Sequence, residues 1–112
     1  MNINFSNKST QNGLNSMIGK KVIVRTYSAG VFFGEISEKC GNEVILKNAR
    51  RLWRWQAGEG ISLSSVAIHG IDESKSKIVE AVSEVWLEAI EVIPCETTAI
   101  ESIEGAKNVK AS

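Results

Sequence analysis

The segment K-N-A-R-R-L-W-R-W at residues 47–55 holds the side chains best suited to bind a ligand. It places three arginines and two tryptophans within six residues. A guanidinium is a planar fork of donors that matches phosphate oxygens two at a time. An indole is a rigid face on which a base stacks, worth about 1–3 kcal/mol per base. The segment therefore predicts binding of a molecule that carries both phosphate and an aromatic base.

Strand geometry would sort these side chains onto two faces. Alternate residues of a strand share a face, which divides the segment into two sets: Arg51, Trp53 and Trp55, and Arg50, Leu52 and Arg54. The first set would present a phosphate clamp and a base platform together. The alternative is that one tryptophan packs in the core while the arginines pair with carboxylates. For the segment as a whole we favour binding.

The residues needed for catalysis are poorly represented. His69 is the single histidine, which excludes a pair of histidines acting as acid and base, and we expect it to be hydrogen-bonded and partly buried. The sequence has neither a glycine-rich phosphate loop nor a Gly-x-Ser-x-Gly elbow. Cys40, Cys95 and His69 are three candidate zinc ligands where a structural site takes about four. We therefore predict a protein that is not an enzyme, needs no cofactor, binds no metal and keeps both cysteines reduced.

The charges are unevenly distributed, although the formal net charge is zero. Residues 20–55 hold eight lysines or arginines and three glutamates, whereas residues 72–104 hold nine acids and two lysines. This asymmetry suggests that the basic half meets phosphates and that the acidic half meets a basic surface of another copy. Two solvated faces are the ordinary alternative. Because small domains often gain stability by oligomerising, we expect at least a dimer.

The length of 112 residues fits one domain. Residues 1–17 are polar, without periodicity or an apolar signal core, and predict a flexible lead-in. Residues 18–106 are expected to form a single β-rich ligand-binding domain, and residues 107–112 a frayed tail. No stretch approaches the roughly 20 apolar residues of a membrane-spanning helix. We therefore expect a cytoplasmic protein.

Strand patterns dominate the first half of the predicted domain. Gly34, inside the second expected strand, indicates a bulge or a close approach by another backbone. Three strands joined by short turns form a β-meander. The expected strands are residues 20–27, 31–37 and 43–48, with turns at 28–30 and 38–42 and with residues 50–55 continuing extended.

The second half of the domain has weaker patterns. The imperfect alternation of residues 61–71 favours a strand. Residues 78–93 fit either a helical stripe or a strand, and we favour a strand over their second half, ended by Pro94.

The end of the domain predicts a short helix. Thr98 and Glu101 have capping-box spacing, which predicts a helix over residues 98–104 that Gly105 closes. The expected fold class is α+β, mainly antiparallel β, with a small twisted sheet or partial barrel built on the β-meander and a short C-terminal helix.

Four segments resemble one known family. They are V-F-F-G-E-I at residues 31–36, V-I-L-K-N-A-R-R-L-W-R-W at 44–55, G-I-S-L-S-S-V-A-I-H-G-I at 60–71 and E-V-I-P-C at 91–95, followed by the short helix. The resemblance covers about residues 18–106. It is to the phage sponge proteins that counter Thoeris defence, the first-described Thoeris anti-defence family.

The resemblance implies that the chain sequesters a signal. In Thoeris, a sensor makes a glycocyclic ADP-ribose that switches on an NAD-destroying effector, and the sponge binds this signal whole without cleaving it. Members of the family form dimers that can assemble into hexamers, and some hexamers also hold cyclic oligonucleotides at separate sites. The resemblance thus implies a phage protein that blocks Thoeris immunity in the cytoplasm of an infected bacterial host.

Candidate binding residues follow from the chemistry of this signal, which carries two phosphates, an adenine and ribose hydroxyls. Arginines would hold the pyrophosphate, aromatic rings would stack the base, and small polar residues would bond the base edge or the ribose. In that order the candidates are Arg25, Arg50, Arg51 and Arg54; Phe32, Phe33, Trp53 and Trp55; and Asn48, Ser62 and Ser64. A site shared between subunits would suit a chain of this size.

A second resemblance supports an alternative function. Residues 19–49 are similar to the small barrels of the Sm or SH3-like kind. That similarity implies a protein that binds RNA or DNA, with the arginine–tryptophan segment following the nucleic-acid strand. A third possibility is a phage structural or interaction protein in which Trp53 and Trp55 anchor an interface.

Overall fold

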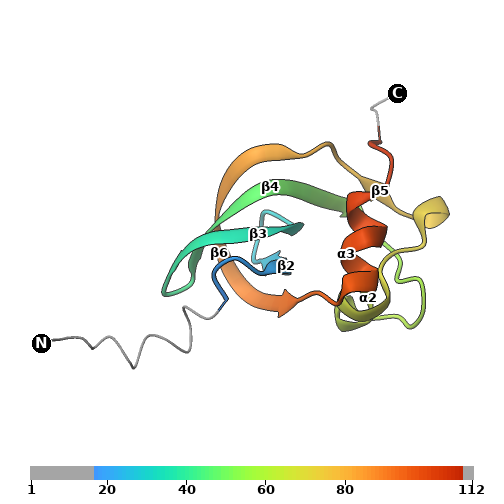
Figure 1. Ribbon diagram of the computed structural model, residues 1–112, viewed down its shortest axis with the longest axis horizontal. Helices are drawn as coiled ribbons and strands as arrows, with labels where there is room; N and C mark the ends of the chain where they lie inside the picture. Colours follow the sequence, from blue (N-terminus) through green and yellow to red (C-terminus); the bar gives the residue numbers. More distant parts are fainter. Residues whose placement is uncertain (1–16, 110–112) are drawn as a thin grey trace, which may run out of the picture.

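The structure, a computed structural model, describes residues 17–109 (Figure 1). Residues 1–16 of the expected lead-in and residues 110–112 of the expected tail lie outside the described residues. The elements in chain order are β2 (Lys21–Thr26), β3 (Val31–Cys40), β4 (Glu43–Arg54), α2 (Leu63–His69), the 3₁₀ helix η1 (Glu73–Lys75), β5 (Lys77–Ile78), β6 (Val82–Pro94) and α3 (Thr97–Glu104).

The strands form one antiparallel sheet in the order β3-β2-β6-β4-β5. Because β3 also pairs with β4, the four strands β2, β3, β4 and β6 close into a ring. The hairpins β2–β3 and β3–β4 make up the predicted β-meander. The prediction of an α+β fold, mainly antiparallel and with a short C-terminal helix, is confirmed.

The ring has two hydrophobic cores. The ring core, between the strands, consists of Val22, Val24, Phe32, Ile36, Val44, Leu46, Ala49, Leu87 and Ala89. The helix-side core lies where α2 and α3 pack beside the sheet (Figure 1), and consists of Ile23, Phe33, Leu52, Ala57, Leu63, Val66, Ala67, Ile71, Ile78, Ile103 and Ala106. Strand β2 serves both cores because its side chains alternate, so three consecutive residues, Val22, Ile23 and Val24, are fully buried.

The predicted strand at residues 61–71 is wrong, because the segment forms helix α2. Ser62 is the N-cap, and its hydroxyl oxygen accepts a hydrogen bond from the amide of Ser65. The imperfect alternation reflects a helical period, since the buried residues of helix α2 have helical spacing: Leu63, Val66 and Ala67.

The prediction of a strand that ends at Pro94 is confirmed. Strand β6 runs over Val82–Pro94 and pairs with both β2 and β4, so the helical stripe is excluded for this segment. Its alternation buries Leu87 and Ala89 in the ring core.

Helix α3 confirms the predicted C-terminal helix, closed by Gly105, but not its capping box. The N-cap is Glu96, which makes no side-chain capping bond, and Thr98 lies inside the helix. The box does not form because the helix begins one residue earlier, at Thr97.

Residues 107–109 are held in place, which corrects the predicted frayed tail for this part of the chain. The amide of Lys107 donates to the Glu73 carboxylate over 2.9 Å. Asn108 forms a parallel bridge with Ile78, and the amide of Val109 donates to the Ile78 carbonyl over 2.9 Å.

A β-bulge interrupts β4 at Asn48. Phe33 pairs with Arg50 and Glu35 pairs with Lys47, so β4 has one residue more than β3 between these pairs. Asn48 takes a left-handed φ of 51°, a conformation that asparagine tolerates better than most residues.

Gly34 lies opposite the bulge, as its position in the sequence predicts. A Cβ at this residue would come within 3.1 Å of the Lys47 carbonyl oxygen and 3.2 Å of the Ala49 Cα. These backbone atoms cannot move aside as a flexible side chain can. The absence of a side chain at Gly34 therefore lets β3 and β4 approach closely at the bulge.

Candidate functional site

The bulge determines which side chains of β4 face the ring core. Before the bulge, Val44 and Leu46 pack in the ring core, and after it Ala49 does so. Alternation from Ala49 then directs Arg51 and Trp53 to the same side. Both side chains line a groove there.

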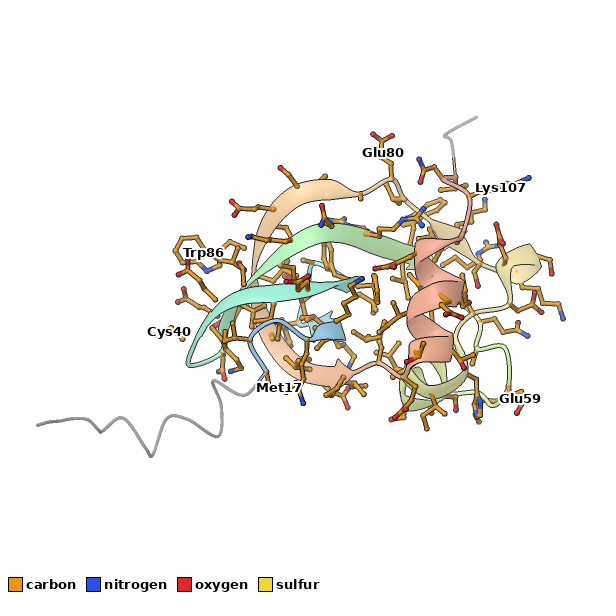
Figure 2. All side chains as sticks on the ribbon, in the orientation of Figure 1. Met17, Cys40, Glu59, Glu80, Trp86 and Lys107 are labelled. Atoms are coloured by element: carbon orange, nitrogen blue, oxygen red, sulfur yellow. The ribbon has the colours of Figure 1, made fainter. Side chains whose placement is uncertain are left out.

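We name this hollow the β4–β6 groove. Its volume is about 820 Å³, within the range of small-molecule sites, which is about 300–1,000 Å³. Glu80 lies where the chain passes from β5 into β6 (Figure 2). The lining residues are Phe32, Ala49, Arg51, Trp53, Lys77, Val79, Glu80, Val82, Glu84, Val85 and Val109.

Arg51 is the arginine that the groove presents. Its Cζ lies 4.6 Å from the centroid of the Phe32 ring, a cation–π contact. Phe32 is 4% exposed, so it supports the guanidinium from below and is too buried to stack a base itself. Within residues 17–109, no hydrogen bond or ion pair engages the Arg51 guanidinium, so its donors remain free for an anion.

Trp53 supplies an aromatic face beside a second cation. Its side chain is 66% exposed, and Lys77 Nζ lies 5.2 Å from its ring centroid. The backbone pairing of β4 with β5 holds Lys77 opposite Arg54, next to this tryptophan. A base stacked on Trp53 would therefore lie close to the positive charge of Lys77. A nucleotide could place its base on the indole and its phosphate near this lysine.

Two carboxylates line the same groove, from Glu80 and from Glu84 of β6. Among the described residues no ion pair joins either of them to Arg51 or Lys77. The groove thus combines two cations, two anions and one exposed indole.

Arg50, predicted to clamp pyrophosphate, is instead part of the helix-side structure. It is 6% exposed, and its guanidinium donates to the carbonyls of Val79, Ile103 and Ala106 and to Oδ1 of Asn108, over 2.7–2.9 Å. Burial lowers the pKa of Arg50 from its ordinary value, and Glu73 partly opposes this. Because these protein acceptors engage all three guanidinium nitrogens, a ligand would have to displace them.

Two predicted stacking residues also belong to the helix side. Phe33 is 2% exposed in the helix-side core, and Trp55 is half-buried against the same core. Trp55 therefore does not share a face with Trp53, because β4 ends at Arg54 and its register shifts before that residue.

The remaining candidates lie outside the groove lining. Arg25 is exposed and bonds Glu91 over 2.9 Å. Ser62 caps α2, and Ser64 is exposed on that helix. Arg54 and Asn48 are exposed on β4 but do not line the groove.

The sequence pattern does not mark Lys77, Glu80, Glu84 and Val109 as groove residues. Lys77 and Glu80 fall near polar connections, and Glu84 has the pattern of a solvated strand residue. Their positions depend on the pairing of β4 with β5 and β6, which is a long-range property. No local signal distinguishes them.

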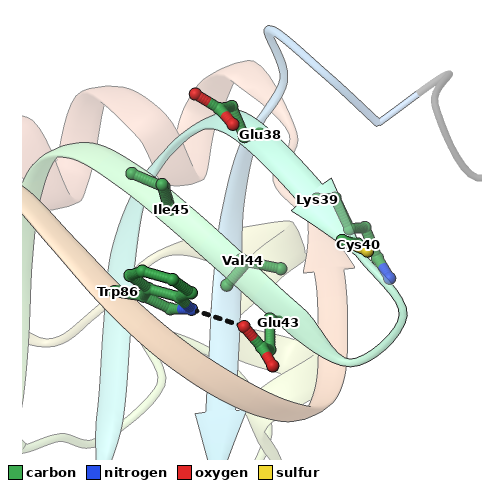
Figure 3. A pocket seen from close by; sticks show the side chains of 7 residues that line it. All are labelled: Glu38, Lys39, Cys40, Glu43, Val44, Ile45 and Trp86. Carbon is green, nitrogen blue, oxygen red and sulfur yellow. Dashed lines mark hydrogen bonds between the residues drawn. The ribbon is translucent and has the colours of Figure 1, made fainter.

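A second hollow lies at the far end of the β3–β4 hairpin (Figure 3). It measures about 120 Å³, too small for a nucleotide. Trp86 crosses it, and its indole Nε1 donates to a Glu43 carboxylate oxygen over 2.9 Å. The groove is the larger and chemically richer of the two hollows.

The basic and acidic halves of the sequence meet within the chain. Lys21 pairs with Glu104, and Arg25 pairs with Glu91, both at the surface. The register also places Lys47 opposite Glu84. Part of the acidic half is therefore paired internally and does not need a second copy.

The single histidine and the cysteines lie away from the groove. His69 is exposed in the last turn of α2, 3.9 Å from a Glu59 carboxylate oxygen, which corrects the expectation of a partly buried side chain. Cys40 is exposed, whereas burial raises the pKa of the Cys95 thiol to about 12. Within residues 17–109, no three metal-binding side chains cluster. No helix in that range has the length and apolar character needed to cross a membrane.

Comparison with protein families adds one finding. Residues 19–103 match the model of a domain of unknown function, DUF6948. No curated protein matches the chain. Because the match covers most of the chain, the protein belongs to the DUF6948 family.

Proposed function

We propose that this protein is a non-catalytic sponge that binds glycocyclic ADP-ribose in the β4–β6 groove and so blocks Thoeris immunity. The observation that carries the proposal is one groove that combines Arg51, whose donors have no partner within residues 17–109, with the exposed face of Trp53 and the neighbouring Lys77. The similarity to the anti-Thoeris sponges adds the identity of the ligand.

The ligand and the groove match in their parts. The pyrophosphate would lie at Arg51 and Lys77, where charge-assisted bonds are the strong ones. The adenine would stack on Trp53. Nanomolar binding requires about 12 kcal/mol, so a sponge needs these contacts together in a site that excludes water.

The proposal requires that the lining residues hold the signal without cleaving it. Among the described residues, the groove lining contains no histidine, serine, threonine or cysteine, which leaves the Glu80 and Glu84 carboxylates as its candidate groups for cleaving a glycosidic bond. We expect the bound signal to remain intact, and this requires that neither carboxylate attacks it or activates water.

Native mass spectrometry of protein purified from cells that make the signal tests the proposal. We expect a homo-oligomer, a dimer or a hexamer, that retains the intact signal, and heat denaturation should release the signal chemically unchanged. Release of linear ADP-ribose with more than one turnover per subunit would show an enzyme. A ligand-free protein that also gives no heat of binding with purified signal would exclude this ligand.

A second candidate function has one observation in its favour. The ring of four strands supports the alternative of an Sm- or SH3-like protein that binds RNA or DNA. Salt separates the two functions, because affinity for a polymer falls steeply with salt in proportion to the phosphates contacted. Affinity for a single pyrophosphate ligand should fall far less between about 50 and 200 mM salt.

A further inference from the structure

The β4–β6 groove has a charge pattern that a simple phosphate site would not have. Arg51 and Lys77 come from β4 and β5, whereas Glu80 and Glu84 come from the start of β6 and the residues before it. The four charged side chains line one hollow, yet no ion pair joins the two signs within residues 17–109.

Two glutamates outside the groove lining already have partners. The Glu73 carboxylate accepts from the amide of Lys107, and the Glu43 carboxylate accepts from Trp86. In the part of the chain that the structure describes, no hydrogen bond or ion pair engages Glu80 or Glu84, although the strand register places Lys47 opposite Glu84. Their acceptor oxygens are therefore free to meet a ligand.

A free carboxylate in an anion site has a cost and a use. An ionised carboxylate is an acceptor and cannot donate, so it repels a bare phosphate and lowers its affinity. It binds a ligand well when that ligand brings O–H donors. A ribose has hydroxyl groups of this kind, and carboxylates bind ribose hydroxyls in dinucleotide sites.

We infer that Glu80 and Glu84 accept hydrogen bonds from ribose hydroxyls, so that the groove selects a pyrophosphate that carries ribose over a bare polyphosphate. The inference rests on the proposed function, because it assumes that Arg51 and Lys77 hold the pyrophosphate. Repulsion between the carboxylates and phosphate disfavours the abundant inorganic anions, whereas the hydrogen bonds from ribose hydroxyls retain the signal.

The test compares glutamine variants on two ligands. Glu80→Gln, Glu84→Gln and the double variant are titrated with glycocyclic ADP-ribose by calorimetry and with inorganic pyrophosphate by NMR. Loss of each charged acceptor should lower the affinity for the cyclic ligand about tenfold. Pyrophosphate affinity should stay the same or rise, because a repelling charge is gone. Opposite responses to the same variant are the signature of hydroxyl recognition.

Glu88→Gln is the matched control. Glu88 is exposed on the same strand and outside the groove lining, so its substitution removes the same charge without removing a groove acceptor. It should leave both affinities unchanged. An equal change in Glu88→Gln and Glu84→Gln would show a long-range charge effect and overturn the inference.

The outcomes separate this inference from the proposed function. Suppose that the wild-type protein binds both ligands and that the glutamine variants raise both affinities or change neither. Hydroxyl recognition is then wrong, while the sponge proposal stands. If the wild-type protein binds neither ligand, both fail. Thermal melts of all variants should match the wild type, since both glutamates are exposed.

Discussion

The two faces of β4 carry neighbouring arginines in opposite roles. On the helix side, Arg50 is buried and donates to four acceptors. On the groove side, Arg51 is exposed above Phe32, and no hydrogen bond or ion pair within residues 17–109 engages its donors. Arg50 and Arg51 are the same type of residue and are adjacent in the chain. The face of the strand on which each side chain lies therefore determines that Arg50 is the structural one.

The acceptors on the helix side explain why burial of Arg50 is tolerated. Two of them, the carbonyls of Ile103 and Ala106, lie at the end of α3, where the helix dipole favours a cation. The others lie before β6 and in the C-terminal segment. Arg50 thus joins β4 to three separate parts of the chain.

The largest expected effect is on the stability of Arg50→Ala. Its loss leaves buried carbonyl oxygens unpaired, and we expect the free energy of unfolding to fall by about 3–5 kcal/mol. Arg50→Lys keeps the charge but loses the planar fork of donors. Its free energy of unfolding should lie between those of Arg50→Ala and the wild type. Urea denaturation measures both. An unchanged midpoint for Arg50→Ala would remove the distinction between the two faces.

The next effect is the affinity of Arg51→Ala for glycocyclic ADP-ribose. Removal of a charged partner of a bound phosphate should cost about 2–5 kcal/mol, or some thirty-fold to several-thousand-fold in affinity. Its stability should remain within about 1 kcal/mol of the wild type. Arg54→Ala, on the same strand but outside the groove lining, is the control. Calorimetric titration that finds equal losses for the two variants would contradict the assignment of the groove.

Trp53→Ala should show a smaller effect of the same kind. Loss of a stacking face costs about 1–3 kcal/mol in affinity, while the melting temperature stays near that of the wild type. Trp86→Ala is the control, because Trp86 is equally exposed, at 69% against 66%, and lies away from the groove. If Trp53→Ala lowers stability and not affinity, Trp53 is a packing residue.

The smallest expected effect concerns the two cysteines. Cys95 packs against the helix-side core, whereas Cys40 is exposed. Burial raises the pKa of Cys95 from 9.0 to about 12. The stabilising effect of the buried thiol is full below pH 9. It falls as pH rises toward 12, by at most about 1.4 kcal/mol per pH unit, because the unfolded chain ionises first.

Denaturation of wild type and Cys95→Ala at pH 8 and pH 10.5 measures this difference. The wild-type protein should lose more stability than the variant over that interval. Iodoacetamide should alkylate the exposed Cys40 in the native protein well before Cys95. Equal alkylation rates would show that the helix-side core opens readily.

The fold could be predicted largely from local patterns, whereas the site could be predicted only in part. The β-branched runs and the turns at Gly30 and Gly41 identify the meander. The segment at residues 47–55 contains two residues that line the groove, Arg51 and Trp53, but its other arginines and its second tryptophan do not line it. Plain alternation separates Arg50 from Arg51 but does not say which of the two faces solvent, because that depends on what covers each face.

The errors have physical causes of two kinds. Helix α2 has only seven residues, so the helical spacing of its three buried residues is too short to stand out as a period in the sequence. Lys77, Glu80 and Glu84 reach the groove through strand pairing between segments far apart in the chain. A single sequence carries no local signal for such pairing.

The bulge at Asn48 also determines how β4 tolerates insertions and deletions over evolution. This residue is the one that β4 has in excess of its partner β3. However, β4 and β6 stay in register across it, with Lys47 opposite Glu84 and Ala49 opposite Val82, so its deletion would remove the bulge and shift β4 by one residue against β6. Gain or loss of one residue between Ala49 and Arg51 would move every later side chain of the strand to the opposite face. An arginine suited to the groove would then point at the carbonyls of α3. We therefore expect homologues to keep both the chain length at residue 48 and the spacing of the residues that follow it.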